Sequence, residues 1–362
     1  VCNCRVLLRH LDPWAKDLCR GVPERCRHQG GIGAYCAKVL AQFTTSEFNT
    51  RCALDRESLS HVRGITVALV DTDPLVEVMP LGTMPCIVIA RQGSELDQTG
   101  QCDVVVDNDR DLDEILTTID RCPQAALATV LLLRGVESRS IDESLIAEST
   151  TYSLLQSGAE FKQWTNQRVN RSAEIDHESS VLSERADDHL IITLNRPMRR
   201  NAYSSQMRSA LAEILQVALA DKSVRAVTLR GAGANFSSGG DLDEFGSFAD
   251  PVTAHMSRLT SSVGASLNAL RERLGQQLRC ELHGENFGAG VELPAFAGWV
   301  VAKADTRLCL PEIALGLVPG AGGTASLPRR IGRQRTAWLA LTGRAIDAHR
   351  AYEWGLIDEI ST

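Results

Sequence analysis

Two glycine-rich loops, each directly after a strand-like run, place the strongest constraint on how this chain folds. The first loop, residues 231–242 (GAGANFSSGGDL), follows the β-branched and apolar run Val224–Arg230. The second, residues 283–293 (HGENFGAGVEL), follows an apolar run that ends at Leu282. A strand is also expected at Leu190–Leu194, and a long amphipathic pattern over Ser204–Ala220 predicts a helix between it and Val224–Arg230. Repetition of strand, glycine loop and helix is typical of an α/β fold with parallel strands.

The chain is long enough for two domains. It has 362 residues, 44% of them hydrophobic and 23% charged, as in globular proteins. Residues 1–60 are expected to be a poorly patterned, Cys- and Arg-rich extension without an assigned function. Residues 61–165 are expected to form a smaller α/β domain with a helical end, and the polar residues 166–188 a linker. Residues 189–362 are expected to form the domain that carries both glycine loops.

The expected N-terminal domain begins with short buried strands and ends in helices. Apolar runs bounded by polar or turn residues predict the strands, whereas apolar residues at helical spacing predict the helices. The expected strands are Ile65–Val70, Cys86–Ala90 and Val104–Val106, and the expected helices are Asp111–Ile119, Gln124–Leu133 and Asp142–Leu155.

Charge and cysteine usage exclude several kinds of partner. The net charge of −7 argues against nucleic acid as the main partner. Without an apolar run of spanning length or a signal pattern, we expect no membrane partner and a cytoplasmic location. Six of the eleven cysteines precede residue 53, but none of them forms a CxxC pair. We therefore expect no metal site, although Cys26 and His28 could ligate together.

The glycine loops suggest an anion-stabilising site. They contain Ser238-Gly239-Gly240-Asp241 and Gly288-Ala289-Gly290. Side by side, they would offer two backbone N–H groups to one oxygen, and one such donor is typically worth about 2.7–4 kcal/mol in catalysis. The alternative is that both are tight turns between a strand and a helix, with no ligand.

Two glutamates close to these loops suggest acid–base chemistry. Glu292 is expected at the start of a helix just beyond the second loop, and Glu312 follows Pro311 after the expected strand Arg307–Leu310. Two carboxylates that hold one water can deprotonate it and deliver a proton to carbon, a contribution of about 10²–10⁴-fold in rate. Alternatively, a glutamate at the start of a helix is favoured by the helix dipole alone.

Five motifs in order resemble the crotonase (enoyl-CoA hydratase/isomerase) family over residues 180–360, about half of the chain. They are residues 194–203 (LNRPMRRNAY), 235–242 (NFSSGGDL), 283–293 (HGENFGAGVEL), 310–324 (LPEIALGLVPGAGGT) and 343–358 (GRAIDAHRAYEWGLID). The resemblance implies a spiral of ββα units. It also implies an oxyanion hole from the N–H groups of Gly240 and Ala289, with Glu292 and Glu312 as the acid–base pair.

The resemblance further implies reversible hydration of a 2-enoyl-CoA thioester by an acyl-CoA lyase. Coenzyme A would enter only as part of the substrate, with no permanently bound cofactor and no metal, and the protein would form a homo-oligomer, a trimer or hexamer in the family. A double-bond isomerase that uses one glutamate and a non-catalytic acyl-CoA-binding protein are the alternatives. The expected substrate and CoA contacts are Arg199, Arg200, Asn201, Ala202, Ser238, Gly239, Asp241, Leu242, Gly288, Pro319 and Gly320.

The chain also departs from the family pattern. Pro294 predicts that the helix after the second loop starts late or kinks. Asp243 and Met198 stand where basic residues often meet the phosphates of CoA. We expect the family's C-terminal helices to be absent after Thr362, yet residues 125–155 weakly resemble them. We therefore hypothesise that the N-terminal domain is a degraded crotonase-like segment whose helices replace them. A structure in which residues 125–165 pack away from the site would overturn this hypothesis.

Overall fold

The computed structural model describes residues 40–61, 66–71, 81–82, 84–93, 101–168, 178–246 and 250–361. All of them belong to one compact unit, residues 37–362. The possible ligands Cys26 and His28 lie outside the described residues. Within the described ranges, no group of three or more His, Cys, Asp or Glu side chains is placed to hold a metal ion. The same ranges contain no helix that is long and apolar enough to cross a membrane.

A parallel four-stranded sheet begins the unit. Its order is β1 (Leu40–Thr44), β2 (Val67–Asp71), β3 (Ile87–Arg91) and β4 (Val104–Val106). The expected strands at Cys86–Ala90 and Val104–Val106 match β3 and β4 to within one residue.

Part of the expected extension is folded. β1 is followed by α3 (Thr45–Leu54) and the 3₁₀ turn η2 (Arg56–Ser58), with Phe48 completely buried. The pattern of α3 is weak because the helix carries few large apolar residues. Its start is nevertheless encoded, since Thr44 and Glu47 form a reciprocal capping box.

The predicted helices of the first half are present, each extended by one or two residues beyond its expected ends. They are α5 (Asp109–Arg121), α6 (Pro123–Arg134) and α7 (Ile141–Gln156), followed by α8 (Ala159–Asn166). Pro123 at the first position of α6 and the capping box of Ser140 with Glu143 on α7 explain where these two helices begin.

The second half is built on two sheets. The larger has the order β13-β10-β8-β7-β6-β5 and is parallel except for the antiparallel pair β5–β6, whereas the smaller has the order β12-β11-β9. β5 lies within the stretch expected to be a linker. The strands are β5 (Val181–Ala186), β6 (His189–Leu194), β7 (Ala226–Gly231), β8 (Leu278–Leu282), β9 (Glu285–Phe287), β10 (Trp299–Lys303), β11 (Arg307–Cys309), β12 (Ile346–Asp347) and β13 (Glu359–Ser361).

The chain alternates between these two sheets, which confirms the expected spiral of ββα units. β8 of the larger sheet leads into β9 of the smaller one and then into α12, and β10 leads into β11 and then α13. The helices are α9 (Ser205–Ala220), α10 (Pro251–Thr260), α11 (Val263–Leu274), α12 (Ala289–Glu292), α13 (Gly323–Ile331), α14 (Arg333–Thr342) and α15 (Ala348–Trp354). The 3₁₀ turns are η3 (Pro197–Arg199), η4 (Leu242–Glu244), η5 (Gly275–Gln277), η6 (Pro294–Phe296) and η7 (Glu312–Leu315).

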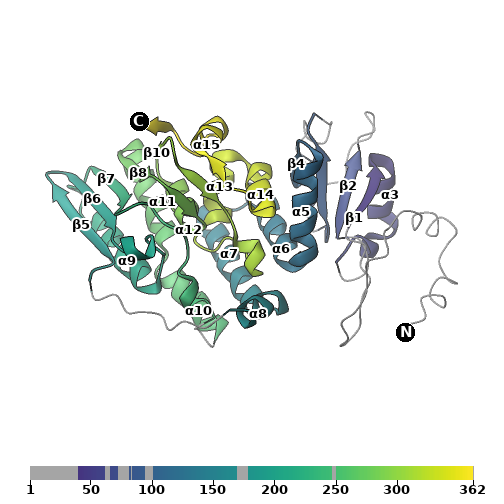
Figure 1. Cartoon of the computed structure of the whole chain (residues 1–362), viewed down its shortest axis with the longest axis horizontal. Helices are drawn as coiled ribbons and strands as arrows, with labels where there is room; N and C mark the ends of the chain where they lie inside the picture. Colours follow the sequence, from purple (N-terminus) through teal and green to yellow (C-terminus); the bar gives the residue numbers. More distant parts are fainter. Residues whose placement is uncertain are drawn as a thin grey trace. The chain divides into compact units, whose positions relative to one another are not determined.

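Helices from the first half pack directly on the second half. α7 contacts α10, α11 and α13, while α5 and α6 contact α14 (Figure 1). One continuous hydrophobic core contains Ile115 and Val130 from the first half together with Ile192 and Leu327 from the second. The structure therefore does not show the arrangement that would overturn the hypothesis that these helices replace the family's C-terminal helices. The origin of these helices and the domain boundaries remain predictions.

Candidate active site

A cavity of about 180 Å³ lies where α7, α9, α10 and α11 meet both glycine loops. Gly240 and Ala289 line it, and so do Glu292 and Glu312. The structure therefore brings together the four residues for which the sequence predicts a direct part in the chemistry. Gly320 lines the same cavity.

The two glycine loops touch each other. A Cβ on Gly239 would lie 2.6 Å from the carbonyl oxygen of Phe287, and Gly239 has a φ of +88°, so only glycine fits here. In the described part of the chain, the N–H groups of Gly240 and Ala289 donate to no protein acceptor. Buried backbone N–H groups without an acceptor are rare in folded proteins. These two donors at the cavity fit an oxyanion hole.

Glu292 lies in the first turn of a helix just beyond the second loop, as expected, but this helix has only one turn and ends at Glu292. Pro294 explains the difference, because it has no N–H for the next helical hydrogen bond, and the chain turns into η6 instead. Oε2 of Glu292 accepts hydrogen bonds from the N–H groups of Ala321 (2.7 Å) and Gly323 (2.8 Å). The carboxylate is therefore held firmly through one oxygen.

Glu312 begins η7 and faces Glu292. A Cβ on Gly288 would lie 2.1 Å from Oε1 of Glu312 and 3.8 Å from Oε1 of Glu292, so these two oxygens share one small space. Oε2 of Glu312 is buried without a hydrogen-bond partner among the described residues. Such an orphan oxygen is costly in a folded protein and is available to a substrate or a water.

Burial keeps protons on this cluster. It raises the pKa of Glu312 to about 8 and, together with the charges of Glu312 and Glu148, raises the pKa of Glu292 well above its ordinary value. Because the carboxyls interact, they lose their protons as a group and not independently. The two N–H groups that bind Glu292 favour its ionised form. For Glu312, a hydrogen bond from its own backbone N–H lowers the pKa, but burial outweighs it.

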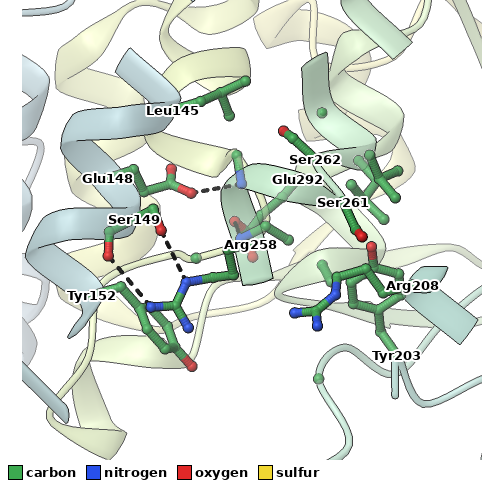
Figure 2. Close-up of a pocket in the computed structure, with 18 of the residues that line it drawn as sticks. Leu145, Glu148, Ser149, Tyr152, Tyr203, Arg208, Arg258, Ser261, Ser262 and Glu292 are labelled. Carbon is green, nitrogen blue, oxygen red and sulfur yellow. Dashed lines mark hydrogen bonds between the residues drawn. The ribbon is translucent and has the colours of Figure 1, made fainter. Parts of the chain in front are cut away.

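A third carboxylate at the cavity was missed by the sequence reasoning. Glu148 of α7, labelled in Figure 2, accepts hydrogen bonds from the N–H of Gly322 (2.7 Å) and from both the N–H (2.8 Å) and the hydroxyl (2.7 Å) of Thr324. It is only 2% exposed, and burial raises its pKa to about 7. A charged residue on a predicted helix is expected at the surface, and the burial of Glu148 becomes apparent only from its contact with α13.

Glu148 and Glu292 accept hydrogen bonds from alternate backbone N–H groups over residues 321–324, at the start of α13. Glu292 takes Ala321 and Gly323, and Glu148 takes Gly322 and Thr324. The first N–H groups of a helix lack partners inside the helix and favour negative charge. Thus α7, from the first half of the chain, holds the segment that positions Glu292.

Most of the predicted CoA contacts lie outside the cavity. Asn201 is completely buried, and its amide bonds the backbone at residues 196, 232 and 235. Asp241 pairs with Arg196 at 2.8 Å, and Arg199 pairs with Asp243 at 2.6 Å. The other predicted contacts that do not line it are Arg200, Ala202, Ser238, Gly239, Leu242, Gly288 and Pro319. Among these, the side chain of Arg200 is 65% exposed.

Gly288→Ala is expected to disrupt the glutamate pair. The new Cβ would clash with Oε1 of Glu312, and the φ of +47° at Gly288 adds a strain of about 1–3 kcal/mol. We expect a lower melting temperature and a large loss of enzymatic activity, both measured on purified protein. Ala289→Gly keeps the backbone N–H and serves as the control. A Gly288→Ala variant as active as this control would show that the pair does not depend on this close contact.

Comparisons with known proteins place the chain in a family. Residues 185–362 match the family described as enoyl-CoA hydratase/isomerase. The chain is 36% identical over 183 residues to 1,2-epoxyphenylacetyl-CoA isomerase and 32% identical over 189 residues to 2,3-dehydroadipyl-CoA hydratase, both of Escherichia coli (strain K12). Each alignment covers 50% of this chain and 69% of the relative. A crystal structure of enoyl-CoA hydratase from Mycobacterium smegmatis is similar over 51% of this chain and 71% of that one, with 32% identity and a TM-score of 0.46.

The chain belongs to the enoyl-CoA hydratase/isomerase family of enzymes. The relatives act on CoA thioesters according to their names, but by different reactions, an isomerisation in one case and a hydration in the other. The particular reaction of this chain must therefore be argued from its own site.

Proposed function

We propose that this protein adds water reversibly to the double bond of a 2-enoyl-CoA thioester. The observation that carries the proposal is the glutamate pair, Glu292 and Glu312, whose Oε1 atoms share one space in the cavity that also contains two unused backbone donors. A water molecule between two carboxyl groups can lose a proton to one of them, while the other delivers a proton to the substrate.

In the proposed mechanism, the N–H groups of Gly240 and Ala289 bind the thioester oxygen. The positive ends of these N–H groups stabilise the enolate that forms when water attacks the β-carbon. Glu292, oriented by its two hydrogen bonds to the start of α13, accepts the proton of the attacking water. Glu312 donates a proton to the α-carbon, which leaves Glu292 protonated and Glu312 ionised. Transfer of a proton from Glu292 to Glu312 across the space that they share then restores both groups for the next turnover.

The pKa of Glu312 makes the proposed acid role testable by pH. Because that pKa is raised to about 8, the carboxyl keeps its proton at neutral pH and loses it above about pH 8. We expect kcat/KM for hydration, which reports the ionisation of the free enzyme, to fall as the pH rises through this value, measured over a range of buffers at constant ionic strength. A kcat/KM that stays constant far above pH 8 would contradict the assignment of Glu312 as the acid.

A double-bond isomerase is the nearest alternative. One relative, 1,2-epoxyphenylacetyl-CoA isomerase, is named for an isomerisation. An isomerase needs a single proton shuttle, whereas both carboxyls here point to the same space. A 3-enoyl-CoA substrate distinguishes the two, because an isomerase converts it to the conjugated 2-enoyl form without adding water.

A further inference from the structure

The cavity contains two arginines that the proposed hydration does not use. Arg208 lies in the first turn of α9, and Arg258 lies near the end of α10 (Figure 2). Neither helix carries an oxyanion donor or a member of the glutamate pair. These arginines are therefore a separate feature of the cavity.

Neither arginine is neutralised by a carboxylate in the described part of the chain. Arg258 donates to Ser149 Oγ (3.1 Å) and to Ser153 Oγ, and its guanidinium lies 4.7 Å from the centre of the Tyr152 ring. Arg208 donates to Ser257 Oγ (2.9 Å), and its Nε is buried without a partner. All hydrogen-bond acceptors of these two cations are uncharged.

The carboxylates of the cavity are engaged elsewhere. Glu148 and Glu292 bind the start of α13, and Glu244 binds the N–H and hydroxyl of Ser205. Burial and, to a smaller extent, the charge of Arg208 lower the pKa of Arg258, whereas Tyr152 and the charge of Glu148 raise it without cancelling the effect of burial. Two cations in one cavity without an ion-pair partner are stabilised by an anionic ligand.

We infer that the acyl group of the substrate ends in a free carboxylate, in addition to its thioester, and that Arg208 and Arg258 bind this carboxylate inside the cavity. This inference rests on the proposed function and specifies its substrate class, a 2-enoyl-CoA ester with an acidic acyl chain. The phosphates of CoA are the other source of negative charge. They are less suitable, because the arginines line the same cavity as the two glutamates and the oxyanion donors.

The test compares substrates that differ only in the terminal carboxylate. Purified wild-type protein is assayed with trans-2-enoyl-CoA esters of several chain lengths and with the matching esters that end in a carboxylate. We expect kcat/KM to be at least about tenfold higher for the acidic ester at the preferred length. Arg208→Met should lower kcat/KM for the acidic ester at least about tenfold more than for the neutral ester, and Arg208→Lys should restore part of this preference.

Arg208 is the better position to change, because Arg258 also joins α10 to α7 and its loss could unfold the site. Arg271→Met, at an exposed position on α11, is the matched control. A wild type that prefers neutral esters at every length would overturn the inference. An Arg208→Met variant that loses activity equally on both substrates would also overturn it, since it would indicate contact with the CoA phosphates.

A binding measurement separates this inference from the proposed function. If wild type hydrates neither substrate, the proposed hydration fails, and calorimetric titration with saturated acyl-CoA esters then tests the arginines alone. Tighter binding of the ester with a terminal carboxylate, lost in Arg208→Met, supports the inference. Equal binding of the two esters contradicts it.

Discussion

Glu312→Gln is expected to lower kcat for hydration by about 10²–10⁴-fold, the typical contribution of a positioned acid. The amide has the size of the carboxyl but cannot give a proton to the α-carbon. Oε2 of Glu312 has no partner among the described residues, so the substitution breaks no hydrogen bond there. Absorbance of the conjugated enoyl thioester measures the rate, and thermal unfolding should show a folded variant.

Glu213→Gln provides the matched control, because Glu213 is exposed on α9 and the same chemical change there should leave the rate unaltered. Glu292→Gln should also lose hydration, since an amide cannot take up the proton of the water. Hydration at the wild-type rate by the Glu312→Gln variant would refute the acid role of this residue.

Glu148→Ala is expected to destabilise the protein and to lower its activity, although Glu148 lies in the first half of the chain. The substitution leaves the N–H groups of Gly322 and Thr324 and the Thr324 hydroxyl without their acceptor. Each buried polar group left unpaired costs about 1–3 kcal/mol in the free energy of unfolding. Because the same segment binds Glu292, we also expect a lower kcat, measured alongside chemical denaturation.

Glu148→Gln keeps an acceptor oxygen and should show smaller losses. Leu154→Ala is the control on the same helix, because Leu154 is 71% exposed. If Glu148→Ala matched this control in both stability and kcat, α7 would have no part in organising the site.

Local sequence signals were sufficient for much of the fold. Strands such as β4 were predicted because short apolar runs lie between polar breakers, and α7 because its apolar residues recur at helical spacing. The weakly patterned α3 was missed, since few of its residues are large and apolar. The short length of α12 was not predicted either, since the sequence analysis expects a late start or a kink at Pro294, whereas the helix ends after one turn.

The site was predicted where family motifs exist and missed where it depends on contacts far apart in the chain. Glu292, Glu312 and the two loops lie in quoted motifs, and the cavity contains them all. Glu148 is 174 residues from Gly322, so no local pattern could indicate that pairing. Arg208 and Arg258 read as ordinary surface charges on amphipathic helices until packing places them in one cavity.

The most direct test of the glutamate mechanism is incubation of purified protein with crotonyl-CoA in ¹⁸O-labelled water. We predict loss of the conjugated enoyl-thioester absorbance together with a product that contains one labelled oxygen, and neither signal from the Glu292→Gln and Glu312→Gln variants. Unlabelled product, or labelled product formed equally well by both variants, would contradict hydration by this pair.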